Sequence, residues 1–220
     1  MSFSIGYLLF PGIQQLDLTG PYDLFSLVPE VRQYLVWKNL DPVRASSGIA
    51  ILPDTTLDNC PQLDMLCIPG GAGIEMLLDD KEAVSFVRKR YITSVCTGSL
   101  ILGAAGLLKG RKATTHWAYL DLLSQFGAQP TQERVVYDGR LITGGGVTAG
   151  IDFALSVIAE CFDNEQAQRV QLALEYAPAP PFTSGDPRQA PESILTAQIA
   201  ATKDVVQRRA AAVARAVARL

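Results

Sequence analysis

The sequence has few of the residues that build metal, disulfide or nucleic-acid sites. Its four cysteines, Cys60, Cys67, Cys96 and Cys161, form no C-x-x-C pair and no zinc spacing, so neither a metal nor a disulfide framework is expected. Lys and Arg number 19 against 22 Asp and Glu, and the net charge of −3 argues against a nucleic-acid partner. Only one histidine, His116, is present.

Long apolar runs are also missing. Glycine, threonine or charge interrupts each run before it reaches the length of a membrane span, so no transmembrane helix is expected. The N-terminal Met-Ser-Phe-Ser-Ile has no basic region and no cleavage pattern of a signal peptide. We therefore expect a cytoplasmic protein with one domain over residues 1–220.

Short apolar strands alternate with helices along most of the chain. The strands are expected at 3–10, 31–37, 65–68, 92–95 and 111–115, with hairpins over 43–52 and 135–143. Helices are expected at 81–90, 117–126, 151–161 and 164–174, followed by a Pro-rich segment at 177–191 and a helix over about 192–219. The alternation predicts an α/β fold with a parallel-rich sheet covered on both faces, and the alternating Ala and Arg of the last helix favour a solvated face.

The stretch around Cys96 has the strongest pattern for chemistry. Ile92–Val95 is β-branched and apolar, Leu100–Leu108 is typical of a helix, and Cys96 lies between them. This arrangement matches a nucleophile elbow, in which Gly98 lets the helix start pack closely. A helix N-terminus favours the thiolate and predicts a lowered pKa for Cys96. The alternative is that Cys96 is only a small buried hydrophobic residue.

Asp17 follows the first strand, between Leu16 and Leu18. A carboxylate at the end of a parallel strand is a candidate acid/base. The alternative is a helix cap, because Pro21 suits the first turn of a helix and Asp is a common capping residue.

Two glycine-rich loops follow strands, Pro69–Gly73 and Gly144–Gly150. The first lacks the fingerprints of dinucleotide and phosphate loops, so no nucleotide cofactor is expected. Backbone N–H groups of Gly70, Gly71 and Ala72 are candidates for an oxyanion hole aimed at the cysteine, with a simple tight turn as the alternative.

The sequence alone leaves the interpretation of two further features undecided. His116 is either a structural or capping residue or a partner of Cys96. The connection at Arg90–Tyr91, between a helix and the elbow strand, is unusually short.

Five motifs together resemble the DJ-1/PfpI superfamily. They are Leu16-Asp-Leu-Thr-Gly-Pro21, Ile68-Pro-Gly-Gly71, Ser94-Val-Cys-Thr-Gly98, Ala113-Thr-Thr-His-Trp117 and Thr143-Gly-Gly-Gly146. The segments Gln14–Pro21, Cys96–Thr97 and Glu175–Phe182 are similar to the isocyanide hydratase branch. The peptidase-like members carry a histidine where this chain has Thr97. Related regulators share the Thr-Thr-His-Trp motif, but no helix-turn-helix domain follows residue 175 here.

The resemblance implies a flavodoxin-like three-layer sandwich, a homodimer, no metal and no organic cofactor. It implies hydration of an isocyanide to an N-formamide, with Cys96 as nucleophile, Asp17 as general acid/base and Thr97 as hydrogen-bond donor. Substrate would lie among Gly70, Gly71, Ala72, His116, Trp117, Gly146 and Val147. Two alternatives stay open: a redox or stress sensor that oxidises Cys96, and a glyoxalase or deglycase acting on small carbonyl compounds.

Overall fold

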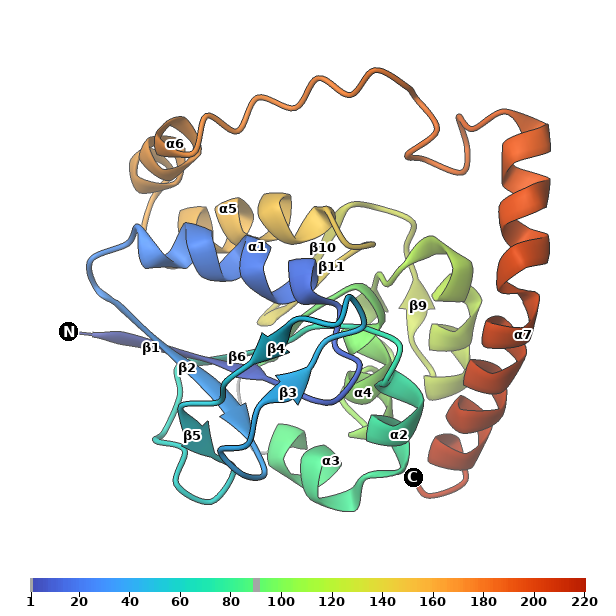
Figure 1. Ribbon diagram of the computed structural model, residues 1–220, viewed down its shortest axis with the longest axis horizontal. Helices are drawn as coiled ribbons and strands as arrows, with labels where there is room; N and C mark the ends of the chain where they lie inside the picture. Colours follow the sequence, from blue (N-terminus) through green and yellow to red (C-terminus); the bar gives the residue numbers. More distant parts are fainter. Residues whose placement is uncertain (1, 89–91) are drawn as a thin grey trace.

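A seven-stranded sheet forms the centre of the computed structural model, which describes residues 2–88 and 92–220 (Figure 1). Its strands lie in the order β10-β11-β7-β6-β1-β2-β5. They are β1 (Phe3–Leu8), β2 (Val31–Trp37), β5 (Thr55–Thr56), β6 (Met65–Ile68), β7 (Ile92–Val95), β10 (Val135–Asp138) and β11 (Leu141–Gly144). All neighbours are parallel except β10 and β11, which form the predicted antiparallel hairpin.

Helices cover both faces of the sheet, as Figure 1 shows. On one face α1 (Gln15–Ser26) packs against α5 (Ala149–Cys161), which in turn contacts α6 (Asn164–Ala173). The other face carries α2 (Ile74–Asp79), α3 (Lys81–Arg88) and α4 (Ser99–Ala104). The predicted flavodoxin-like three-layer sandwich is confirmed, because the apolar β6 and β7 are buried along their whole length.

The smaller elements depart from the sequence predictions in detail. The hairpin of β3 (Val43–Arg44) and β4 (Ala50–Ile51) forms as predicted. The strand expected at 111–115 is shorter, since only β8 (Lys112–Ala113) pairs, with β9 (Gln129–Pro130). The segment η2 (Trp117–Phe126) is a 3-10 helix ended by Gly127 in the left-handed region.

The chain after residue 176 lies outside the sandwich. Residues 177–191 form no helix or strand and, in Figure 1, arch from α6 to α7 (Glu192–Val217). The second half of α7 packs on α2, α4 and η2. The short connection expected at Arg90–Tyr91 lies outside the described residues. None of the described helices is long and apolar enough to span a membrane.

Candidate active site

Four loops meet at the carboxyl edge of the sheet. Because β1, β6, β7 and β11 are parallel, the segments that follow them lie at the same edge. These segments bring Asp17, Gly70, Cys96 and Val147 together.

Cys96 sits on a sharp turn between β7 and α4. Its backbone φ is 55°, an unfavourable value for a residue with a side chain, and the surrounding hydrogen bonds hold it there. The Cys96 N–H donates to the Gly145 carbonyl at 2.9 Å, and the Cys96 carbonyl accepts from Thr115 Oγ1 at 2.8 Å. A Cβ on Gly98 would lie 2.0 Å from the Ile68 carbonyl oxygen, so the elbow requires glycine at this position.

The pKa of Cys96 differs from the sequence prediction. Burial raises the pKa of the thiol, and the nearby Asp17 carboxylate raises it further. The backbone N–H groups of Val147 and Thr97 act in the predicted direction and lower the pKa, but they do not outweigh burial. The expectation of an acidic thiol is therefore wrong for the resting site, where Cys96 keeps its proton near neutral pH.

Asp17 is fully buried and is not a helix cap. Helix α1 begins at Gln15, so Asp17 lies in its first turn, and the cap position belongs to Gln14. The helix begins six residues before the expected start at Pro21 and runs through that proline, where Gly20 and Pro21 pack against the first residues of α5. This packing outweighs the loss of the N–H that proline cannot donate.

The carboxyl group of Asp17 faces the Cys96 thiol. Oδ2 accepts from the Gly70 N–H at 2.8 Å, while Oδ1 has no nitrogen or oxygen donor in the described part of the chain. Burial raises the pKa of Asp17 to about 7, although the Gly70 N–H and a weak hydrogen bond with the Cys96 thiol lower it. A carboxyl group with this pKa exchanges protons readily near neutral pH.

The Pro69–Gly73 loop is a support for side chains rather than an open oxyanion hole. Gly70 N–H is used by Asp17, and Gly71 N–H donates to Thr97 Oγ1 at 3.1 Å. The prediction that these two groups aim at the cysteine is therefore wrong, because both already have acceptors. Ala72 is exposed. A Cβ on Gly70 would lie 2.5 Å from Thr97 Oγ1, so only glycine lets the loop come this close.

The second glycine-rich loop supplies the donor that the first does not. The Val147 N–H, just before α5, faces the Cys96 thiol and lowers its pKa. Gly146 lies against His116, since a Cβ there would come within 2.9 Å of the imidazole. The loop is also held by its backbone, because Gly145 N–H donates to the Arg134 carbonyl at 2.8 Å.

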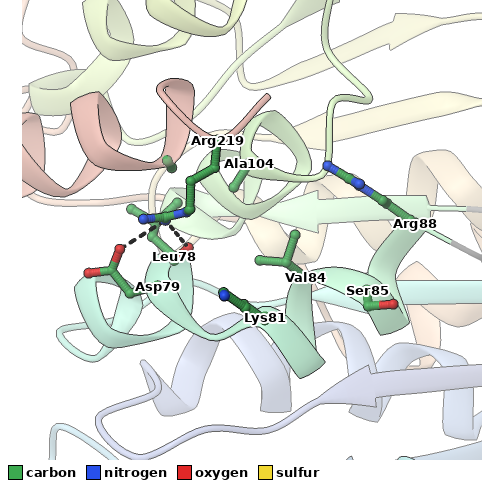
Figure 2. Close-up of a pocket in the computed structure, with 9 residues that line it drawn as sticks. Leu78, Asp79, Lys81, Val84, Ser85, Arg88, Ala104 and Arg219 are labelled. Atoms are coloured by element: carbon green, nitrogen blue, oxygen red, sulfur yellow. Dashed lines mark hydrogen bonds and ion pairs between the residues drawn. The ribbon is translucent and has the colours of Figure 1, made fainter.

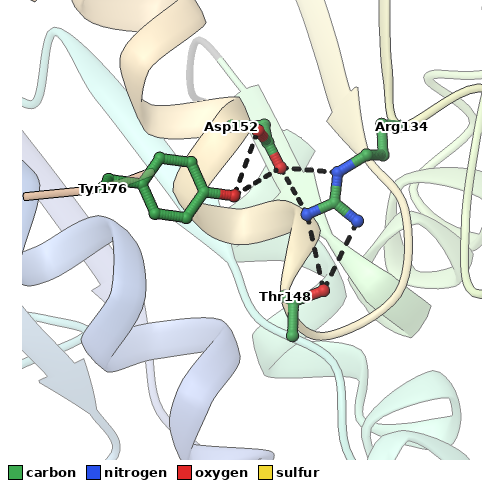
Figure 3. A network of polar contacts seen from close by, with 4 residues as sticks. All are labelled: Arg134, Thr148, Asp152 and Tyr176. Atoms are coloured by element: carbon green, nitrogen blue, oxygen red, sulfur yellow. Dashed lines mark hydrogen bonds and ion pairs between the residues drawn. The ribbon is translucent and has the colours of Figure 1, made fainter. Parts of the chain in front are cut away.

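A polar network anchors the first turn of α5, as Figure 3 shows. Arg134 forms an ion pair with Asp152, and Tyr176 Oη donates to Asp152 Oδ1 at 3.2 Å. Thr148 lies at the N-cap position of α5 but makes no capping hydrogen bond, and its hydroxyl accepts from Arg134 at 3.4 Å instead. Tyr176 thus connects the Glu175–Phe182 motif, to which it belongs, with the loop that carries Val147.

His116 acts as the cap of η2. Its Nδ1 accepts from the Ala118 N–H at 3.2 Å. Burial, with the charge of Arg209, lowers the pKa of His116 to about 4, so the imidazole is neutral at pH 7. Its ring contacts the rings of Trp117 and Tyr119 in tilted arrangements, at centroid distances of 5.6 and 5.5 Å. Of the two alternatives for His116, the structure supports the capping residue.

Sequence reasoning missed Arg209 and Tyr119. Arg209 is only 6% exposed, although its helix was expected to present a solvated face. A signal was present, because Val205, Val206, Ala212, Val213 and Ala216 flank Arg209 at helical spacing and place it within an apolar stripe. Tyr119 is buried and lies close enough to Cys96 for their charges to interact.

The fold and the site define a doubly wound α/β protein with a cysteine on a sharp strand-to-helix turn and a buried carboxyl group beside it. Within residues 2–88 and 92–220, no three His, Cys, Asp or Glu side chains are grouped so that they could hold a metal ion. The DJ-1/PfpI family model matches residues 4–160. The chain belongs to the DJ-1/PfpI family.

Individual relatives extend this assignment. The chain is 57% identical over 200 residues to the isonitrile hydratase of Pseudomonas putida, which covers 89% of this chain and 88% of that protein. It is 33% identical to the HTH-type transcriptional regulator CdhR of Pseudomonas aeruginosa, over 80% of this chain and 54% of the regulator. A crystal structure of a ThiJ/PfpI family protein from Pseudomonas syringae superposes with a TM-score of 0.94 at 45% identity, covering 97% of this chain and 91% of that one.

Proposed function

We propose that this protein is an isocyanide hydratase that converts R–N≡C and water to the N-formamide R–NH–CHO. The observation that carries the proposal is the buried pair of Cys96 and Asp17 at a strained elbow. The identity of 57% with an isonitrile hydratase over nearly the whole chain supports the substrate class.

The first step forms a covalent thioimidate. The Cys96 sulfur attacks the terminal carbon of the isocyanide as its proton passes to Asp17. One π pair of the C–N bond moves to nitrogen, and the carbon keeps its lone pair. Asp17 then delivers the proton to that carbon and gives R–N=CH–S–Cys96. The Val147 and Thr97 N–H groups face the sulfur and stabilise negative charge on it in the transition state.

The second step adds water. Asp17, now a carboxylate, takes a proton from water as the oxygen bonds to the thioimidate carbon, and the proton passes on to nitrogen. The resulting R–NH–CH(OH)–S–Cys96 collapses when the C–S bond breaks and its electron pair returns to sulfur. The hydroxyl proton returns to the Asp17–Cys96 pair, so the pair is regenerated. A carboxyl group with a pKa of about 7 suits both directions of transfer.

The test is a spectrophotometric and mass-spectrometric assay with a small aryl isocyanide. We expect formamide from the wild-type protein and none from Cys96→Ala or Cys96→Ser. The matched controls are Cys60→Ser, Cys67→Ser and Cys161→Ser, which should keep most of the turnover because none of these thiols is at the elbow. A folded wild-type protein that leaves the isocyanide unchanged would refute the proposal.

The site favours the hydratase over the sensor alternative. Oxidation of a cysteine requires thiolate character and access, whereas Cys96 is 6% exposed and its pKa is raised. No feature of the site favours a glyoxalase or deglycase reaction over the hydration.

The proposal includes a homodimer in the cytoplasm. The spacing of the four cysteines indicates no disulfide framework, which suits a reducing compartment. Apolar side chains of the last fifty residues support a second copy as partner, since Leu172, Phe182, Ile194 and Ile199 are each more than half exposed.

A further inference from the structure

Arg209 links α7 to the loop that holds the catalytic pair. Its Nη2 donates to the Gly71 carbonyl at 3.0 Å, across 138 residues of sequence. Its guanidinium carbon lies 4.2 Å from the centroid of the Tyr119 ring, a cation–π distance. Its Nε is buried without a hydrogen bond, 3.7 Å from Glu75 Oε1. Burying a charge at this depth is costly even when it is paired.

The helix that carries Arg209 is firmly anchored beyond it. Figure 2 shows Arg219 donating to the Leu78 carbonyl and pairing with Asp79 at the rim of a pocket of about 220 Å³. Arg215 pairs with the same carboxylate at 2.8 Å. These contacts place the second half of α7 without help from Arg209, so packing of the helix alone does not explain the buried guanidinium.

The Gly71 carbonyl is a direct route to the active site. Gly71 has a φ of 150°, and its N–H holds Thr97 while the preceding N–H, of Gly70, holds Asp17. A hydrogen bond on the Gly71 carbonyl therefore fixes the orientation of the peptides that support both side chains. The family match ends at residue 160, so α7 lies outside the part shared with the family model.

We propose that Arg209 is a positioning residue for the hydration: it holds the Gly71 carbonyl and the Tyr119 ring so that the loop keeps Asp17 and Thr97 aligned with Cys96. The proposal rests on the proposed function for the identity of the reaction. The C-terminal helix thereby completes an active site whose reacting groups all come from the first 150 residues.

The charged and titratable groups around this linkage are few. Arg209 faces Glu75 from α2, and His116 and Tyr119 from η2. Asp17 faces the thiols of Cys96 and of Cys67 from β6. The Gly70 N–H lowers the pKa of Asp17, so a loop that loses its anchor should let that pKa rise.

The experiment compares Arg209→Met, Arg209→Lys and Arg208→Met in the full-length protein. Arg208 is the matched control, because it pairs with the same Glu75 but has a side chain 60% exposed. The protonation midpoint of Asp17 is followed by its infrared carboxyl band, as the difference from the corresponding Asp17→Asn protein. The kcat and KM for an aryl isocyanide and the melting temperature are measured in parallel.

For Arg209→Met we expect the Asp17 midpoint to rise by about half a pH unit or more and kcat to fall about tenfold, with KM changed less. Arg209→Lys should have an Asp17 midpoint and a kcat between those of the wild type and Arg209→Met. An ammonium group can donate to the Gly71 carbonyl, but it lacks the planar geometry of the guanidinium group. Arg208→Met should match the wild type. If Arg209→Met does not fold, Arg209→Lys decides by the same measurements.

The proposal is overturned if the Arg209 variants lose only thermal stability and keep the wild-type midpoint and kcat. The protonation midpoint of Asp17 is measured by infrared spectroscopy without a substrate, so it tests the role of Arg209 independently of the reaction. If no preparation hydrates an isocyanide but the midpoint still shifts, the proposed function fails and the positioning role of Arg209 stands.

Discussion

At the residue scale, local sequence was sufficient to select Cys96 and Asp17 as candidate reacting groups and insufficient to find what tunes their pKa values. Cys96 and Asp17 were predicted because each follows a short apolar strand, a signal contained in a few neighbouring residues. The direction of the Cys96 pKa was predicted wrongly, because burial and a carboxylate from another segment outweigh the helix N-terminus. Arg209 was missed because its helical pattern was interpreted as a solvated face, and the Gly71 carbonyl that it bonds lies 138 residues away in the sequence.

Asp17→Asn separates proton transfer from nucleophilicity. Removing the Asp17 charge should lower the pKa of Cys96 and speed its alkylation by iodoacetamide at pH 8. Hydration should nevertheless fall by about a hundredfold or more, because the amide cannot carry the proton. Alkylation of the Cys96 peptide by mass spectrometry and isocyanide turnover provide the two measurements. Near wild-type hydration by the variant would remove Asp17 from the mechanism.

The raised pKa of Asp17 also predicts a pH dependence of stability. Asp17 holds its proton up to a pH of about 7 in the folded protein, whereas in the unfolded chain it releases it near 3.8. Its contribution to stability is therefore fully present below about pH 4 and is lost as the pH rises through 7. Asp17→Asn has no such loss, so the melting temperature of the wild type should fall relative to that of the variant between pH 5 and 8. If the melting temperatures of the two proteins change in parallel with pH over this range, the pKa of Asp17 is not raised in the folded protein.

At the element scale, the strands and helices were predicted where their packing agrees with local preference. The elbow, the 135–144 hairpin and α6 lie close to the expected boundaries. The start of α1 was misplaced because packing of Gly20 and Pro21 on α5 outweighs the usual position of proline in a helix. The oxyanion prediction for the Gly70–Gly71 loop failed because the acceptors that occupy its N–H groups come from α1 and the elbow.

Gly98→Ala tests the close packing of the elbow. Gly98 has an ordinary helical φ of −56°, so the effect is steric and not a matter of backbone preference. A Cβ at 2.0 Å from the Ile68 carbonyl oxygen must push β6 and the elbow apart, and we expect a loss of about 3 kcal/mol or more in the free energy of unfolding. Denaturant unfolding measures this loss.

Gly185→Ala is the matched control for that substitution. No atom lies within 4 Å of a Cβ at Gly185, and it is not in the left-handed region. Its free energy of unfolding should stay within about 1 kcal/mol of the wild type. Equal effects of the two substitutions would show that the elbow tolerates a side chain at Gly98.

At the scale of the whole molecule, the alternation of strands and helices was enough to predict a parallel-rich sandwich. The order β10-β11-β7-β6-β1-β2-β5 was not predictable from it, because strand order depends on which crossovers pack best across the sheet. The path of α7 was also not predictable from the sequence pattern. Its first half has no buried residue, and its buried residues are all between 209 and 216.

The exposed first half of α7 predicts how two copies associate. Ile194 and Ile199 are 55% and 52% exposed, and Figure 1 shows this part of the helix beside the arch of residues 177–191, away from the sheet. If a second copy covers this surface, a buried carboxylate in place of each isoleucine would be strongly unfavourable. Ile194→Glu with Ile199→Glu should therefore lower the mass in solution, measured by light scattering, from twice 23.7 kDa to 23.7 kDa. Leu52→Glu is the control, because Leu52 is 63% exposed but lies in the loop after β4. If the dimer survives the double substitution and dissociates with Leu52→Glu, the interface lies near Leu52 and not on the first half of α7.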